Sequence, residues 1–112
     1  MKFFTILLFC GLSGLVGQVF AQDAMVEHGN EVYLYWCAPC HDDGPRRPGT
    51  LALQFLYKGE KPAVLDQRTD LIPEYTKTIV RNGVSIMPFF RKTEISDTEL
   101  DALAAYLARN NN

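Results

Sequence analysis

The sequence has no surplus of basic residues: its 112 residues include 11 Lys and Arg against 13 Asp and Glu, for a formal net charge of -2. Without a basic run, the chain lacks the electrostatic attraction on which nucleic-acid binding or a polybasic membrane-surface site depends. Histidine is also scarce, with two residues, and cysteine with three. No internal repeat or low-complexity tract is present. The length predicts a single domain.

The first twenty residues differ from the rest, since they hold four of the seven Phe and one of the three Cys, Cys10. A positive start at Met1-Lys2, an apolar run over 3–16 and small or modest residues up to Ala21 predict a cleaved secretory signal peptide, residues 1–21. The alternative is an uncleaved anchor, but this needs about 20 strongly apolar residues, and Gly11, Gly14 and Gly17 dilute the run. We therefore expect export to the periplasm and no stable membrane anchor.

Residues 22–112 form the predicted mature domain, which has 10 basic and 13 acidic side chains and is mildly acidic. A domain of this size buries a small fraction of its surface, so a disulfide, metal or cofactor often completes its core. After removal of the leader, Cys37 and Cys40 are the remaining cysteines. We therefore expect such a stabilising group at these two cysteines.

The pattern of apolar residues predicts an all-α fold. Ser96 and Glu99 form a capping box ahead of an apolar stripe that includes Leu103 and Tyr106, which predicts a helix over 96–109. Further helices are predicted over 26–36, over 73–81 with Asn82-Gly83 as a left-handed stop, and over 51–57. A strand over 31–36 is the alternative for the first of these. Residues 44–49 and 59–62 are loops by composition.

The motif Cys37-Ala-Pro-Cys40-His41 is typical of c-type haem attachment. Two cysteines three residues apart lie about one helical turn apart, so each thiol can add to a different vinyl group of one porphyrin. His41 follows at once and can direct its imidazole at the iron. The motif therefore predicts one covalently attached haem c.

Three other interpretations compete for the two cysteines. A thioredoxin-like thiol oxidoreductase would place Trp36-Cys-Ala-Pro-Cys40 after a buried strand, but only about fifteen mature residues precede Cys37 and the chain after it is helical. A structural disulfide closing so short a loop would add little stability. A zinc site would need a fourth ligand, and His28 is the other histidine of the chain.

A second axial ligand is predicted about fifty residues later. Met25 and Met87 are the thioethers that remain after leader removal. Met25 lies near the start of the mature chain, whereas Met87 lies in a loop between two predicted helices, and Pro88 restricts it to extended geometry. Without the haem motif, a methionine filling a gap in the core would be the default interpretation. With the motif, Met87 is the predicted iron ligand.

Together these residues resemble a small class I cytochrome c. The resemblance rests on Cys-Ala-Pro-Cys-His, on the Met87-Pro88 loop, on Gly29 four residues before Tyr33 and on Leu103 three residues before Tyr106. It implies three to four helices around one haem, with the first and last helices crossing at these positions. In this family a proline carbonyl accepts a hydrogen bond from Nδ1 of the axial histidine. Pro48 is the candidate for this role, and Pro45 is the second.

A narrower similarity covers residues 73–75, 79–83, 87–88 and the last helix. These segments are similar to the cytochrome subunit of 4-cresol dehydrogenase, a flavocytochrome that oxidises alkylphenols, and to that of eugenol hydroxylase. This similarity implies a periplasmic carrier of single electrons that receives them from a flavoprotein dehydrogenase subunit and delivers them to a periplasmic redox acceptor. Such a chain would not be an enzyme by itself.

Other functions remain open at this point: a diffusible cytochrome that serves a terminal oxidase or peroxidase, a haem enzyme or gas sensor in which Met87 leaves the iron, and the thiol oxidoreductase. Ile86, Phe89 and Phe90 could form an apolar docking patch. Since Phe89 and Phe90 are adjacent in an extended stretch, one of them should point outward. Arg68, Tyr57 and Tyr75 are candidate partners for the haem propionates, with no preference among them.

Overall fold

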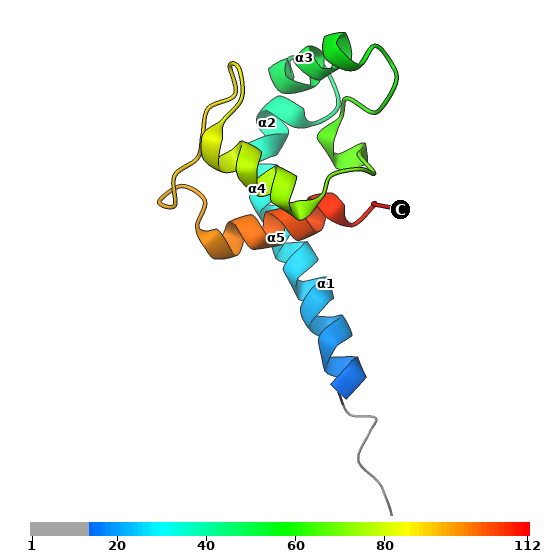
Figure 1. The fold of residues 1–112 in the computed structure, drawn as a ribbon, viewed down its shortest axis with the longest axis vertical. Coiled ribbons are helices and arrows are strands. Elements are labelled where there is room, and N and C mark those ends of the chain that lie inside the picture. The colour runs from blue at the N-terminus through cyan, green and yellow to red at the C-terminus, as the bar shows by residue number, and fades with distance from the viewer. Residues whose placement is uncertain (1–13) are drawn as a thin grey trace, which may run out of the picture.

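The computed structural model describes residues 14–112, which form helices joined by loops (Figure 1). The helices are α1 (Gly14–Val32), the π-helix η1 (Tyr33–Cys37), α2 (Ala38–His41), α3 (Pro48–Tyr57), the 3-10 helix η2 (Leu65–Gln67), α4 (Pro73–Asn82) and α5 (Asp97–Ala108). Within the described part of the chain, the sole β-type pairing is an isolated bridge between Val84 and Met87. The predicted all-α class is confirmed.

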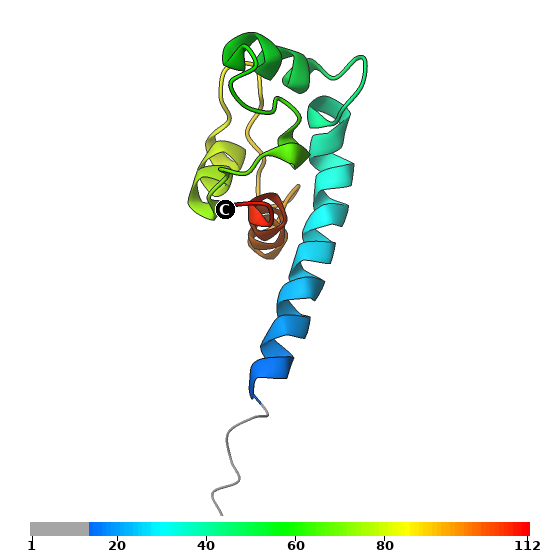
Figure 2. The same ribbon diagram turned by 90° about the vertical axis from the view of Figure 1, so that its right-hand side faces the viewer.

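The core is centred on the crossing of α1 and α5, which Figures 1 and 2 both show. Gly29 is buried at this crossing, where a Cβ atom would lie 2.6 Å from the Ala102 carbonyl carbon and 2.7 Å from the Tyr106 Cβ. One turn further along, the Tyr33 and Tyr106 rings pack with their centroids 5.5 Å apart. Leu103 is fully buried. The predicted contact of Gly29 and Tyr33 with the last helix is therefore confirmed.

Local sequence explains where α5 and α4 begin and end. The Ser96 hydroxyl accepts a hydrogen bond from the Glu99 amide at 3.2 Å, and Glu99 Oε2 accepts one from the Ser96 amide at 2.7 Å, which is the predicted capping box. Pro73 opens α4, and Gly83 ends it with φ 71° and ψ 170°. The positive φ at the end of the helix is as predicted. The ψ angle differs, because it lies in an extended region that almost only glycine adopts and not in the left-handed helical region.

Two boundaries differ from the sequence predictions. The helix predicted over 51–57 begins three residues earlier, at Pro48. Proline suits the first turn of a helix because its missing N–H would have no partner there, whereas composition alone placed Pro48 in a loop. The helix predicted over 26–36 begins earlier, at Gly14, and continues as η1 to Cys37. The alternative of a strand over 31–36 is wrong.

The predicted signal peptide lies in part outside the described residues, as does Cys10. Residues 14–21 are the first turns of α1. The division at Ala21 therefore stays a prediction. Among residues 14–112, no helix is both long enough and apolar enough to cross a membrane.

The remaining elements sit at one end of α1, beyond its crossing with α5. In Figure 2, α2 lies on one side of this part of the molecule, the segment between α4 and α5 lies on the other, and α3 spans the end above both. The haem-attachment motif spans the last residue of η1 and all of α2, and Met87 is in the segment between α4 and α5. The fold thus places the two predicted ligand segments on opposite sides of one region.

Candidate functional site

Cys37, Cys40 and His41 lie where the first long helix ends. The π-helix η1 joins α1 to α2, and its end is marked by a hydrogen bond from the Ala38 amide to the Tyr33 carbonyl. Pro39 follows in the first turn of α2. A proline inside an unbroken helix would clash with the carbonyl four residues before it and leave that carbonyl without a donor. The π-turn resets the hydrogen-bond register just before Pro39, so the helix can continue to His41.

The two cysteines have different environments. Both thiols are free; Cys37 is buried and Cys40 is exposed. Burial raises the pKa of the Cys37 thiol to about 12, with a smaller contribution from neighbouring Cys40. A buried thiol held as the neutral S–H is a poor nucleophile. This argues against Cys37 and Cys40 working as a reactive dithiol pair, and the described residues contain no strand of the kind that precedes a thioredoxin-like motif.

The His41 imidazole is held by contacts with the start of α3. A Cβ atom on Gly49 would lie 2.7 Å from His41 Cε1 and 2.8 Å from both Nδ1 and the Cys40 carbonyl oxygen. Only glycine permits so close a backbone approach. Burial lowers the pKa of His41, which favours the neutral ring. A neutral imidazole is the form that ligates a metal.

The backbone next to His41 is fixed by two side chains. The Tyr33 hydroxyl donates a hydrogen bond to the His41 carbonyl at 3.3 Å. The Thr50 hydroxyl, from α3, donates one to the Asp42 carbonyl at 2.8 Å, and Thr50 is 3% exposed. Sequence reasoning missed Gly49, Thr50 and the hydroxyl of Tyr33. No local pattern marks them, because each acts on residues eight positions away.

His41 Nδ1 is buried and has no hydrogen-bond partner. The predicted bond to the Pro48 carbonyl is therefore absent from this structure. Because α3 begins at Pro48, that carbonyl belongs to the first helical turn, where carbonyls point along the axis towards later amides. Pro48 as the partner of Nδ1 in the haem-bound protein stays a prediction.

Met87 lies in a tight turn between α4 and α5. Val84 and Met87 exchange two backbone hydrogen bonds, 3.1 Å from the Val84 amide and 2.9 Å from the Met87 amide. Ser85, inside the turn, has φ 53°. The loop position agrees with the sequence prediction: the turn itself is made by Ser85 and Ile86, and Met87 lies in the β-bridge that follows it. Met87 itself is half-buried, whereas Met25, the other thioether of the mature chain, is 45% exposed.

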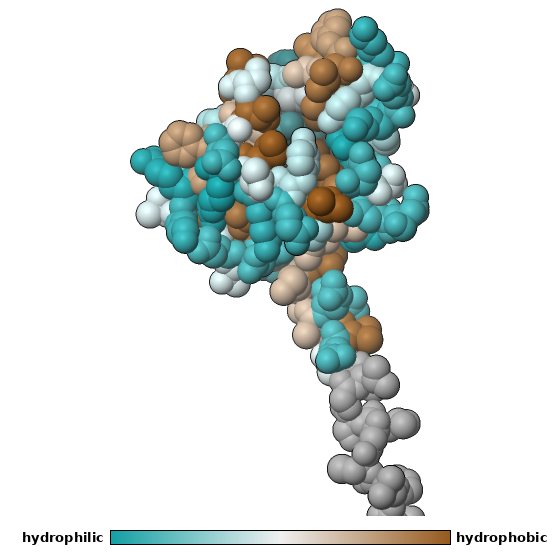
Figure 3. Space-filling view, in the orientation of Figure 1, coloured by the Kyte–Doolittle hydropathy of each residue, from teal (hydrophilic) through white to brown (hydrophobic). Residues whose placement is uncertain are grey.

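Apolar side chains surround the region between the two ligand segments. Figure 3 shows hydrophobic atoms gathered over α3 and over the segment that follows α4. The exposed large side chains of these elements are Leu51, Phe55, Leu56, Val84, Ile86 and Phe89. Phe89 is 58% exposed, whereas Phe90 is half-buried against the core. This confirms that one of the two points outward, and apolar surface of this kind suits a porphyrin or a partner.

Arg68, which directly follows η2, is buried, with 5% of its surface exposed. It donates hydrogen bonds to the Tyr57 hydroxyl at 2.6 Å and to Asp70 at 2.5 and 2.9 Å. These bonds raise the pKa of Arg68 and lower that of Asp70. Of the candidate propionate partners, Arg68 and Tyr57 are thus brought together, while Tyr75 is 53% exposed on α4.

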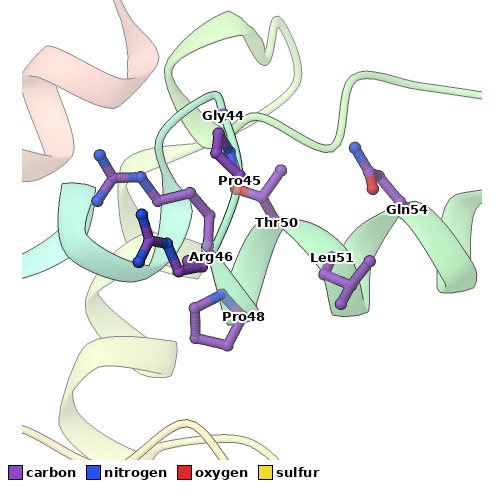
Figure 4. A pocket seen from close by; sticks show the side chains of 8 residues that line it. Gly44, Pro45, Arg46, Pro48, Thr50, Leu51 and Gln54 are labelled. Carbon is purple, nitrogen blue, oxygen red and sulfur yellow. The ribbon is translucent and has the colours of Figure 1, made fainter.

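A cavity of about 470 Å³ lies between the loop 44–47 and the first turns of α3 (Figure 4). Its lining includes Pro45, Arg46, Arg47 and Gln54. Its lining does not include Cys37, Cys40, His41 or Met87. This cavity is therefore separate from the haem-attachment motif.

The residues present fit a covalently bound haem. Two free thiols three residues apart, a buried imidazole with an unpartnered Nδ1 and a thioether at the end of a turn are the donor set that such a haem uses. The described residues contain no cluster of three or more His, Cys, Asp or Glu side chains able to hold a metal ion. The zinc interpretation is therefore not supported by this structure.

Comparison with known proteins agrees with this donor set. The family model described as cytochrome C oxidase, cbb3-type, subunit III matches residues 24–107, about three quarters of the chain. No curated protein and no solved structure matches the chain. The chain thus belongs to this family of cytochrome c domains, its cofactor is covalently bound haem c, and its role is that of a haem electron carrier.

Proposed function

We propose that residues 22–112 act in the periplasm as a monohaem cytochrome, with haem attached through Cys37 and Cys40 and with His41 and Met87 as the axial ligands. The observation that carries the proposal is the setting of His41: it directly follows Cys40, its imidazole packs against Gly49, and its Nδ1 is buried without a hydrogen-bond partner. No separate catalytic residue is needed for this function. When bound, haem supplies reversible one-electron chemistry, and two strong axial ligands leave no open position for a substrate.

The chain contributes by holding its ligands in place before electron transfer. Tyr33 and Thr50 fix the main chain at the His41 and Asp42 carbonyls, and Gly49 packs against the imidazole itself. Two main-chain hydrogen bonds between Val84 and Met87 likewise fix the backbone that carries the thioether. A thioether ligand in apolar surroundings favours Fe(II) over Fe(III) relative to a second imidazole. A moderately high reduction potential follows.

The ligand assignment is tested by covalent haem content and by absorption spectra in a host that attaches haem c. Cys37→Ala together with Cys40→Ala should abolish covalent haem in a pyridine haemochrome assay. Met87→Ala should keep the haem but lose the weak long-wavelength band of Fe(III)–methionine ligation.

Met25→Ala and His28→Ala are the matched controls, since they remove the other thioether and the other imidazole of the mature chain and should change neither property. Covalent haem in the double cysteine variant would overturn the assignment, as would a normal band in Met87→Ala.

For the electron donor, we propose a flavoprotein dehydrogenase that oxidises phenols or alkylphenols, with a separate periplasmic acceptor downstream. The similarity of the α4 region and the Met87-Pro88 loop to alkylphenol flavocytochromes supports this donor. Stopped-flow reduction by a flavoprotein of that class, together with co-purification of the two, is the test. Failure of the mature protein to associate with such a flavoprotein or to be reduced by it would exclude this donor.

A second candidate partner is a terminal oxidase, because the matching family is described as a subunit of a cytochrome c oxidase. In that case, the reduced protein should be oxidised rapidly by oxidase-containing membranes, and the reaction should stop with a haem–copper oxidase inhibitor. The two partners are distinguished by running both assays on one preparation. A periplasmic fractionation with mass determination of the mature chain tests export and cleavage at Ala21.

A further inference from the structure

Main-chain hydrogen bonds join both ends of the segment that carries Met87 to the last turn of α4. At its start, the Gly83 amide donates to the Ile79 carbonyl at 2.8 Å. At its return, the Phe90 amide donates to the Val80 carbonyl, also at 2.8 Å. A side chain on Gly83 would lie 2.7 Å from the Met87 carbonyl oxygen, so the turn folds back directly over this glycine. Residues 83–90 therefore form a loop that main-chain hydrogen bonds close at both ends.

Arg81 adds side-chain hydrogen bonds at the second end of this loop. Its Nη1 donates hydrogen bonds to the Phe90 carbonyl at 3.1 Å and to the Ile95 carbonyl at 2.8 Å. Its Nη2 donates to Asp97 Oδ1 at 2.9 Å. The Arg81 side chain is 22% exposed. One planar guanidinium thus joins α4, the return of the loop and the first turn of α5, which the fork geometry of arginine suits and a lysine ammonium does not.

The neighbouring cations do not share this arrangement. Lys92 pairs with the same Asp97 at 2.7 Å, but its side chain is 73% exposed. Arg91 pairs with Glu94 at 3.3 Å and is 71% exposed. Among the hydrogen bonds of the described residues, only those from Arg81 join a side-chain donor to main-chain carbonyls of residues 83–95. Exposed ion pairs of the Lys92 kind contribute little to stability, whereas part-buried bonds from a charged donor contribute more.

We propose that Arg81 is the positioning residue for the Met87 ligand: by holding the Phe90 and Ile95 carbonyls, it keeps the loop closed and the thioether at its place. The proposal rests on Met87 being an axial ligand. Arg81 does not contact the reacting atoms, so its effect should appear in ligand exchange rather than in haem attachment. Arg81 enters the sequence analysis only as one position of the similar segment 79–83, because an arginine near a helix C-terminus is ordinarily explained by the helix dipole.

The test uses the mature haem-loaded protein and exogenous imidazole as a competitor for the Met87 position. Imidazole is titrated into the ferric protein, and loss of the Fe(III)–methionine band is followed. In Arg81→Ala the apparent affinity for imidazole should rise by roughly tenfold or more, since two bonds from a charged donor no longer oppose opening. Lys92→Ala is the matched control, because it removes a cation from the same Asp97 and should leave the affinity within about twofold of wild type.

Arg81→Lys makes the test decisive if Arg81→Ala fails to fold or to retain haem. A lysine keeps the charge and can pair with Asp97, but it cannot span the carboxylate and both carbonyls. Imidazole affinity should rise in this variant too, with covalent haem content unchanged. If Arg81→Lys and Lys92→Ala behave alike, Arg81 does not position Met87 and the inference is wrong.

The same experiment separates this inference from the proposed function. A wild-type protein without the methionine band, or with a spectrum identical to that of Met87→Ala, contradicts Met87 as a ligand and overturns both. A wild-type protein with the band, but with unchanged imidazole affinity in both Arg81 variants, contradicts the role of Arg81 alone.

Discussion

Replacing Gly29 by alanine should push apart the two helices on which the fold is built. The added Cβ would lie 2.6 Å from the Ala102 carbonyl carbon and 2.7 Å from the Tyr106 Cβ, and closer still to the Ala102 carbonyl oxygen. Carbon atoms in contact are normally about 3.5–4.0 Å apart, so α1 and α5 must separate by about 1 Å. Two of the three obstructing atoms are backbone, and no rotamer change can move them aside.

The size of the effect follows from two opposing contributions. Forcing an extra carbon into a packed core costs about 1–3 kcal/mol, and a backbone clash belongs at the upper end of that range. Alanine is favoured over glycine in a helix by about 1 kcal/mol. The net loss in the free energy of unfolding should therefore be about 2 kcal/mol. For a domain of this size, the melting temperature should fall by about 8–16 °C.

The measurement is urea unfolding of the haem-loaded mature protein, followed by far-UV circular dichroism. Glu27→Ala and Glu27→Gly are the matched controls, since Glu27 is exposed on the same helix and the pair gives the intrinsic preference for alanine directly. Their difference should favour alanine, opposite in sign to the effect at Gly29. A Gly29→Ala protein as stable as wild type would refute the close contact of α1 and α5.

Three further predictions concern the surroundings of the site. Gly49→Ala would place a Cβ 2.7 Å from His41 Cε1, so the imidazole must turn. The reduction potential should therefore shift in a redox titration. The free energy of unfolding, measured with urea, should fall by about 1–3 kcal/mol. Tyr33→Phe removes the hydroxyl that holds the His41 carbonyl and should cost about 0.5–1.5 kcal/mol, with a shift in the imidazole proton resonances by NMR. Hydrogen bonding from Arg68 lowers the pKa of Asp70, so this pair stabilises the fold at neutral pH. The stabilisation is lost as the pH falls below about 4 and Asp70 becomes protonated. Asp70→Asn should therefore lower the urea midpoint at pH 7 more than at pH 3.

The controls for these variants lie close by. Tyr106→Phe removes the hydroxyl of the other ring in the Tyr33–Tyr106 pair, which bonds Asp66 rather than the His41 backbone, so its NMR spectrum should keep the wild-type imidazole resonances. Gln54→Ala changes an exposed position of α3 and should leave the potential unchanged. Equal effects of Tyr33→Phe and Tyr106→Phe on the imidazole would contradict a specific role for the Tyr33 hydroxyl, and an unchanged potential in Gly49→Ala would contradict its contact with the ring.

Much of the site could be predicted because its characteristic residues lie a few positions apart in the sequence. The Cys-x-x-Cys-His motif, the capping box at Ser96 and Pro73 at the start of α4 are local patterns, and the helices formed where these patterns placed them. The boundary of α3 and the ψ angle of Gly83 could not be predicted as well. Composition does not distinguish a proline in a loop from one at the first turn of a helix.

The sequence by itself predicted the cofactor, because the Cys-x-x-Cys-His motif places both thiols and an imidazole within five residues. The crossing of the first and last helices followed from the resemblance to class I cytochromes c, and Met87 as the second ligand stays a prediction. Only the tertiary structure decided that Gly49 abuts the His41 ring, that Phe90 rather than Phe89 packs inward, and that Arg81 holds the loop carrying Met87. These contacts join segments eight or more residues apart. Their partners are selected by how α1, α3, α4 and α5 pack together, and no single segment of sequence encodes that packing.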